Sequence, residues 1–154
     1  MQNNIKELND KVIRWNNLMG VDVNFSFKFP DMQTRVLAHD LMVEESEELR
    51  DAETKDDVLD ACADQLFVLM GNMAKYGVSY DEVIFKLRQV VKSNFSKFAT
   101  SKESAEASII SEAERLNIPQ EDVGYTRIDG LYVIYNKKSG KILKSVEYLP
   151  PNES

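Results

Sequence analysis

Four glutamates occupy five consecutive positions in the stretch LMVEESEELRDA, residues 41–52. Like charges three or four positions apart on a helix repel each other by roughly a few tenths of a kcal/mol, and no lysine or arginine separates these four glutamates. Helical geometry puts Glu44, Glu45 and Glu48 on one side, while Glu47 points elsewhere. This excess of like charge predicts that a cation from outside the chain neutralises the group.

A second acidic pair follows on the next predicted helix, where Asp60 and Asp64 lie one turn apart in the sequence DACAD. The turn near Lys55 is short, so the two helices must pack antiparallel. Glu48 lies seven residues before Lys55 and Asp64 nine after it, which places both at similar heights at about 1.5 Å per residue. Carboxylates gathered there select hard cations. We expect Mg²⁺ to bind, with Mn²⁺ as a substitute.

Hydrophobic periodicity predicts five helices that position these acids. Asp31 is the expected N-cap of the first acidic helix, and Thr54 or Asp56 that of the second. An alternating stretch between the first two helices, VDVNFSFKFP, is interpreted as an extended connector because it has no nearby strand partner and ends at a proline. The predicted helices span residues 5–19, 31–54, 56–77, 79–98 and 100–117.

After residue 125 the periodicity becomes that of β-strands, with two runs on either side of a loop at residues 136–140. The predicted fold is therefore mainly α, a bundle of four to five helices with a small C-terminal β-hairpin. We predict a helical domain over residues 1–118 and a hairpin appendage with a tail over residues 119–154.

Composition excludes several classes of protein. The chain has 154 residues, 43% of them hydrophobic, and a net charge of −7, which would repel nucleic acid over most of its surface. It has no apolar run long enough to span a membrane and no signal-peptide pattern at its start, so a cytoplasmic location without membrane contact is expected. The single cysteine, Cys62, is expected to be a buried, inert thiol.

Three motifs together carry a resemblance to a known family. EESEEL, LDACADQLFVLMGNMAKYGV and KSNFSK occur in that order, and GLYVIYNKKSGKILKSVEYLPP follows near the C-terminus. With them the chain resembles the MazG-like all-α nucleoside triphosphate pyrophosphohydrolases, and within them the phosphoribosyl-ATP pyrophosphohydrolase-like branch. The resemblance covers about residues 31–151 and is loose over residues 101–126.

The resemblance implies Mg²⁺-dependent hydrolysis of a nucleoside triphosphate, a deoxynucleoside triphosphate or a phosphoribosyl-ATP-like nucleotide to the monophosphate and pyrophosphate. Many relatives carry a glutamate at the position of Ala61, and its metal role passes here to the preceding aspartate. Glu44 or Glu45 would orient the attacking water, and the sequence does not decide between them. The implied metal ligands are Glu45, Glu48, Asp60 and Asp64.

Basic and amide side chains are implied to hold the substrate phosphates, namely Lys97, Asn94 and Lys144. Each has a structural alternative: Asn94 and Lys97 suit a helix C-terminus, and Lys144, like Lys141, suits an exposed strand. In such a family, Trp15 and the phenylalanines of NFSFKF are candidates for stacking on the base, but residues of this kind are more often core. The core interpretation is preferred here.

Two further readings compete with the enzyme. The chain could be a helical regulator without enzymatic activity, whose acidic patch binds a metal or a basic partner. A di-iron bundle is disfavoured, because it needs Glu-x-x-His pairs and the only histidine, His39, is not in one. Since one small bundle has little room for a nucleotide, relatives pair subunits, and we expect a homodimer or a dimer of dimers, with the apolar fourth helix as a candidate interface.

Overall fold

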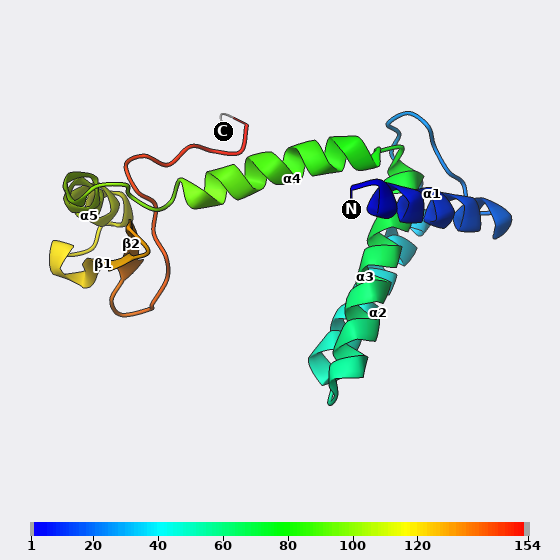
Figure 1. Cartoon of the computed structure of the whole chain (residues 1–154), viewed down its shortest axis with the longest axis horizontal. Coiled ribbons are helices and arrows are strands. Elements are labelled where there is room, and N and C mark those ends of the chain that lie inside the picture. The colour runs from blue at the N-terminus through cyan, green and yellow to red at the C-terminus, as the bar shows by residue number, and fades with distance from the viewer. Residues whose placement is uncertain (1, 153–154) are drawn as a thin grey trace. The chain divides into compact units, whose positions relative to one another are not determined.

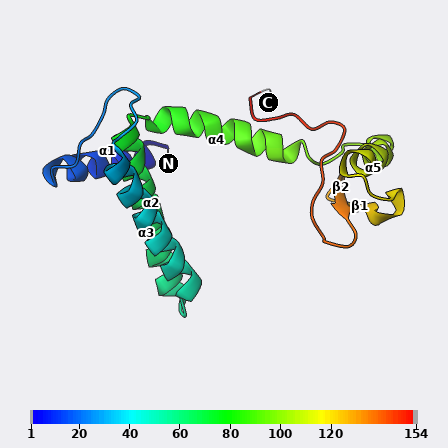
Figure 2. The same cartoon turned by 180° about the vertical axis from the view of Figure 1, so that it is seen from behind.

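A computed structural model describes residues 2–152, and contacts divide the chain into two units, Met1–Ile84 and Phe85–Ser154. Along these described residues run five α-helices: α1 (Gln2–Leu18), α2 (Met32–Asp51), α3 (Lys55–Tyr76), α4 (Tyr80–Phe95) and α5 (Lys102–Leu116). A short 3₁₀ helix, η1 (Gln120–Asp122), precedes two strands, β1 (Val123–Ile128) and β2 (Leu131–Asn136). Figures 1 and 2 show these elements, and each unit is described by itself.

The first unit is built on α2 and α3, which lie side by side in both views. Asp31 caps α2 by accepting a hydrogen bond from the Thr34 backbone N–H at 2.7 Å. Thr54 caps α3 in a capping box with Asp57, so Thr54 rather than Asp56 is the cap. These caps start both acidic helices at the expected places.

Helix α3 packs with a face other than its most apolar one. Its buried residues include Ala61, Gly71 and Ala74, and α1 and α2 both contact this helix. Leu59 and Leu66, which belong to the predicted apolar face, remain 56% and 57% exposed. Small residues face the neighbouring helices because they allow close approach, and this leaves a stripe of large apolar side chains uncovered within the chain.

Cys62 shares that uncovered side of α3 and is exposed, so the prediction of a buried thiol is wrong. One residue along an α-helix turns the side chain by about 100°. Ala61 takes the buried position next to it, with 2% exposure. A rotation of this size moves the thiol away from α1 and α2.

The connector between α1 and α2, residues 19–31, forms no strand, as predicted. It is fixed to the end of α3 by backbone hydrogen bonds from Asn24 N to Ala74 O and from Lys28 N to Tyr76 O, both 3.0 Å long. Its phenylalanines do not enter a core. Phe25 is 90% exposed, and the rings of Phe27 and Phe29 are also exposed and pack edge to face against each other.

The core interpretation of these phenylalanines is therefore wrong for the chain by itself. Trp15 is also 47% exposed, although its ring packs edge to face on Phe67 of α3. The physical reason is that the connector runs over the surface of the helices, so its rings stay largely in contact with solvent.

In the second unit, α5 packs against both strands of the hairpin. The strands are antiparallel, with Ile128 opposite Leu131, and the turn consists of Asp129 and Gly130. Both residues have positive φ, of 50° and 85°, which is the conformation that the tightest hairpin turns require. The Asp-Gly pair is the signal for this turn.

The hairpin thus lies earlier in the chain than predicted. The expected loop at residues 136–140 exists, but the run after it forms only a single bridge, between Tyr135 and Ile142. A two-residue Asp-Gly turn holds two strands in register more firmly than a five-residue loop. The ladder therefore forms around Asp129 and Gly130.

One cluster of buried apolar residues lies in this second unit, around Ala99, Ala105, Val123, Ile134 and Leu143. Since α5 contributes to that cluster together with the hairpin, the predicted boundary at residues 118 and 119 falls inside a compact unit. As a boundary of the functional domain it stays a prediction.

The predicted fold class is confirmed, since the protein is mainly α with a two-stranded antiparallel hairpin near its C-terminus. Over residues 2–152, no helix has both the length and the apolar character needed to cross a membrane.

Candidate functional site

Two contacts set the register of α2 against α3 near the acidic residues. The turn between the helices is closed by the Thr54 capping box, in which the Asp57 carboxylate accepts hydrogen bonds from the Thr54 and Glu53 backbone N–H groups. Farther along, the Gln65 side-chain amide donates to the Glu45 carbonyl at 3.1 Å. Antiparallel packing with this register brings the second half of α2 opposite the first half of α3.

Three carboxylates converge there. Glu45 and Glu48 from α2 and Asp64 from α3 each offer an oxygen, and these oxygens all lie within 4.8 Å of one another. Glu45 is half-buried, whereas Glu48 and Asp64 are exposed. The predicted convergence of acids from both helices is therefore present in the structure for these three residues.

The electrostatics of this group show the cost of placing like charges together. The pKa of Glu45 is raised, first by desolvation and then by the negative charges of Glu48, Asp64 and Glu44. No lysine, arginine or histidine forms an ion pair with Glu45, Glu48 or Asp64 among the described residues. Protein groups thus leave the charge of the cluster uncompensated.

The remaining acids lie outside the group of three. Glu44 is exposed and acts on Glu45 through its charge, and Asp60 is exposed on α3. Glu47 lies 3.6 Å from Arg50 on its own helix, away from the cluster, as its position predicts. The roles assigned to Glu44 as a base and to Asp60 as a ligand stay predictions.

The three residues expected to hold phosphates belong to the second unit, and each has a local partner there. Lys97 Nζ donates to Asn94 Oδ1 at 2.6 Å, and Asn94 Nδ2 donates to the Val90 carbonyl of the same helix at 2.9 Å. Lys144 Nζ lies 4.2 Å from the centre of the Tyr148 ring. These contacts suit the structural alternatives, and a phosphate-binding role for the three remains a prediction.

The donor set fits a hard divalent cation. Three carboxylates supply only oxygen ligands, which Mg²⁺ and Mn²⁺ prefer, and no histidine or cysteine belongs to the group. The raised pKa of Glu45 has the sign expected for a site whose charge a cation would balance. Glu45, Glu48 and Asp64 are thus the residues that would hold the metal.

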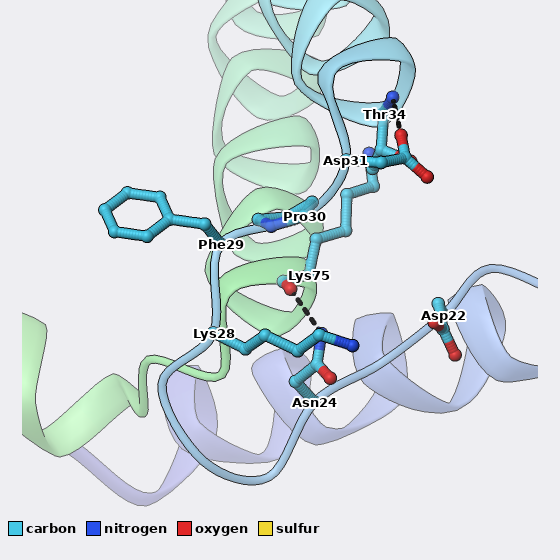
Figure 3. Close-up of a pocket in the computed structure, with 8 residues that line it drawn as sticks. All are labelled: Asp22, Asn24, Lys28, Phe29, Pro30, Asp31, Thr34 and Lys75. Carbon is cyan, nitrogen blue, oxygen red and sulfur yellow. Dashed lines mark hydrogen bonds between the residues drawn. The ribbon is translucent and has the colours of Figure 1, made fainter.

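Sequence reasoning did not predict two features near this site. Gln65 links the two helices beside the carboxylates. The only feature of the sequence that pointed to this contact is the position of its amide directly after Asp64. A pocket of about 340 Å³ lies between the connector, the start of α2 and the end of α3, with Lys75 in its wall (Figure 3). The sequence feature that pointed to this pocket is the lysine in the mostly uncharged stretch NMAKYG.

The fold and the acidic cluster define the class of the protein: it is mainly α, and its two acidic helices form a site suited to a divalent metal. Residues 25–90 match the family model of phosphoribosyl-ATP pyrophosphohydrolase, which belongs to the MazG-like all-α superfamily. This match confirms the predicted resemblance for the segment. A comparison with curated proteins found no match for the chain.

The matched segment contains all three clustered carboxylates as well as the connector. Members of the family are pyrophosphohydrolases that act on phosphoric anhydride bonds. The KSNFSK motif and the hairpin lie beyond residue 90, so the resemblance stated for them stays a prediction.

Proposed function

We propose that this protein is a Mg²⁺-dependent pyrophosphohydrolase that converts a nucleoside triphosphate, or a phosphoribosyl-ATP-like nucleotide, to the monophosphate and pyrophosphate. The observation that carries the proposal is the convergence of Glu45, Glu48 and Asp64 within the segment that matches the family. Mn²⁺ is the expected substitute for Mg²⁺ because it prefers the same oxygen ligands.

The roles of the residues follow from their positions. When bound, a divalent cation would neutralise charge on the phosphate oxygens and acidify water at the site. Glu48 and Asp64 are exposed and reach the cluster from different helices, which suits them to hold the cation at the substrate side. Glu45 lies deeper, and either it or Glu44 would orient the attacking water and take up its proton.

The alternative of a regulator without enzymatic activity requires a different arrangement. A docking patch for a basic partner would spread its charges over a convex surface. Here three oxygens from two helices lie within 4.8 Å of one another, an arrangement that favours a cation. The match to a family whose members hydrolyse phosphoric anhydride bonds favours the enzyme over a regulator that only binds a metal.

We also propose that the protein works as a homodimer or a dimer of dimers. Apolar side chains on the helices of the first unit, among them Leu59, Leu66 and Leu69, are exposed in the single chain. Exposed stripes of this kind mark contact surfaces. A second copy of the chain would cover them and enlarge the wall available to a nucleotide.

The reaction is tested by following pyrophosphate release from a panel of nucleoside triphosphates and phosphoribosyl-ATP with Mg²⁺. Glu48→Gln and Asp64→Asn should each lower kcat/KM by at least about 100-fold, since losing even an outer-shell contact to a metal costs about 10–100-fold. Glu47→Gln is the matched control, because it removes one charge from the same helix outside the cluster. Wild-type rates in both cluster variants would show that the site is wrongly assigned.

A further inference from the structure

The two long edges of the β-hairpin differ in how completely their backbone groups are paired. On the outer edge of β2, Tyr132 exchanges two backbone hydrogen bonds with Ala99, at 2.8 and 2.9 Å. Two residues farther along the same strand, the Ile134 carbonyl accepts a hydrogen bond from the Leu143 backbone N–H at 2.8 Å. The chain itself therefore covers this edge of the hairpin.

The outer edge of β1 has no such cover. Backbone groups in an antiparallel pair point alternately toward the neighbouring strand and away from it. Tyr125 is opposite Ile134 and Arg127 is opposite Tyr132, so the N–H and C=O groups of Tyr125 and Arg127 point to the free side of β1. Among the described residues outside the ladder, none forms a hydrogen bond with the backbone of either residue. Each of the two thus leaves one donor and one acceptor for water or for another strand.

This edge also lacks the usual protection against pairing. Soluble proteins blunt an exposed strand edge with a lysine, a proline, a bulge or a covering segment. β1 has six residues, VGYTRI, without lysine or proline, and its pairing with β2 is continuous, without a bulge. Its one charged side chain, Arg127, lies over the Tyr132 ring, with 5.8 Å between the guanidinium carbon and the ring centre. An edge left open in this way indicates a surface that another strand covers.

The strand that fits this edge is β1 of a second copy of the chain. In an antiparallel pairing about a two-fold axis at Thr126, Tyr125 of each copy lies opposite Arg127 of the other. Residues that point outward then meet each other, so each of these two pairs can exchange two backbone hydrogen bonds. The threonines face each other, and each arginine lies beside a tyrosine ring, both of which are favourable neighbours across strands.

The neighbouring registers fit less well. A two-fold axis at Arg127 would place the two arginines directly opposite each other, and like charges in such a pair are destabilising. An axis at Tyr125 would place Arg127 opposite Val123, whose backbone N–H already donates to the Gln120 carbonyl. Of the three registers, only the one about Thr126 joins backbone groups that are all free and keeps the arginines from facing each other.

Helix α5 leaves room for this arrangement. It contacts both strands (Figures 1 and 2), and the core cluster that it shares with Val123 and Ile134 places it on one face of the hairpin. The two-fold axis is perpendicular to the sheet, so both copies of α5 lie on the same face. The second hairpin is displaced by two strand spacings, about 9–10 Å, and packed helices are about 8–10 Å apart. Two copies of α5 can therefore lie side by side over four strands.

We propose that β1 joins two copies of the chain in an intermolecular antiparallel sheet centred on Thr126. The contact is short, because only Tyr125 and Arg127 supply its backbone hydrogen bonds, and one such contact is weak by itself. Two of them act together when two dimers meet, so their strength rests on the dimer proposed above for the first unit. The hairpin thereby supplies the second interface of a dimer of dimers, from a part of the chain outside the matched residues 25–90.

Disulfide trapping tests the contact and its register. In a non-hydrogen-bonded antiparallel pair the two Cα atoms lie about 4.5 Å apart, within the range of about 4.4–6.8 Å that a disulfide spans. Thr126→Cys, with Cys62→Ser to remove the natural thiol, should therefore link two chains when oxidised glutathione is added. Non-reducing gel electrophoresis measures the linked fraction.

Ile128→Cys in the same background is the matched control. Residue 128 is exposed and lies on the same face of β1 as residue 126. The register places it opposite Gly124, four residues or about 13 Å from its own copy, so the linked fraction should be at least tenfold lower than for Thr126→Cys. Equal linking in the two variants, or none in Thr126→Cys, would overturn the proposal. The second of these results is the one expected if a strand of another protein covers the edge.

Arg127→Pro tests the backbone contact. A proline at this position removes an N–H that the hairpin does not use, and proline is tolerated on an edge strand that faces solvent. The mass measured by light scattering over a dilution series should therefore fall from that of four chains to that of two. Arg127→Ala is the control, because it loses the same charge, keeps the N–H and should keep the higher mass. A mass that does not change in Arg127→Pro would overturn the proposal.

These measurements separate the hairpin contact from the dimer of the first unit. Circular dichroism establishes that Arg127→Pro folds, and the trapping experiment needs no proline. Oxidation accumulates even short-lived pairs as linked chains, so Thr126→Cys decides on the hairpin contact where the wild type has the mass of one chain. A wild type of that mass with linked Thr126→Cys chains would remove the first-unit dimer and support the contact at Thr126.

Discussion

The raised pKa of Glu45 reflects desolvation and the negative charge that gathers at the site. It is the half-buried member of the cluster, and its pKa is raised by desolvation and by the like charges of Glu48, Asp64 and Glu44. Its ionised form is therefore less favourable in the metal-free fold than in water. A bound cation would reverse this effect, because it interacts favourably with the ionised form.

This gives a pH-dependent prediction for the metal-free protein. The pKa of Glu45 is higher in the folded than in the unfolded chain, so the folded state binds more protons at pH values between the two pKa values. The contribution of Glu45 to the free energy of unfolding therefore falls as pH rises through this range. Glu45→Gln lacks the effect. In chelator, the melting temperature of the variant should therefore rise relative to that of the wild type as pH increases above the ordinary pKa of a glutamate, about 4.3.

Thermal melts in EDTA provide the measurement, with Glu47→Gln as the control because Glu47 lies beside Arg50. Added Mg²⁺ should raise the melting temperature of the wild type more than that of Glu45→Gln. A pH-independent difference between the wild type and Glu45→Gln would contradict the prediction.

At the scale of the elements, the connector and α3 meet at a glycine. Gly77 ends α3 with a φ of 65°, and a Cβ there would lie 2.1 Å from the Ser26 carbonyl oxygen. The positive φ needs a glycine, and the close approach of the connector needs one too. One residue thus serves both the end of the helix and the wall of the pocket.

Gly77→Ala should therefore lower the free energy of unfolding by clearly more than the roughly 1–2 kcal/mol expected for a left-handed alanine alone. Gly20→Ala is a matched control, because Gly20 has a φ of 72° and nothing within 4 Å of the added Cβ. Urea denaturation measures both. Equal losses in the two variants would mean that the contact with Ser26 relaxes without cost.

At the scale of the molecule, the first unit buries little apolar surface by itself. The cluster of buried apolar residues lies in the second unit, whereas Leu59, Leu66 and Leu69 form an exposed stripe on α3. Helix α4 likewise exposes Leu87 and Val91. These surfaces are where a second copy of the chain would stabilise the fold.

Leu66→Asp should reduce the mass measured by light scattering from that of an oligomer to that of one chain, 17.6 kDa, because it places a charge in the middle of the stripe. Ile110→Asp on α5 is the control, with the same change at a residue of similar exposure in the other unit. A wild-type protein of monomer mass at micromolar concentration would remove the proposal of a dimer.

Much of the fold was predictable because its signals are local. Asp31 and Thr54 cap their helices through side chains that reach only three residues ahead, and Gly77 ends α3 where the sequence indicated. The acidic cluster was predictable for the same reason: a short turn forces two helices antiparallel, and counting residues then places Glu48 beside Asp64. These features depend on the order of a few neighbouring residues.

The sequence by itself therefore determined the five helices, the caps and the convergence of the acids, since each follows from short-range geometry. Only the tertiary structure decided that Cys62 and the phenylalanines of the connector are exposed, and that the buried Lys75 faces a pocket. The physical reason is that burial depends on which face of a helix its neighbours cover. That choice is made by contacts between residues far apart in the chain, such as Asn24 and Lys75.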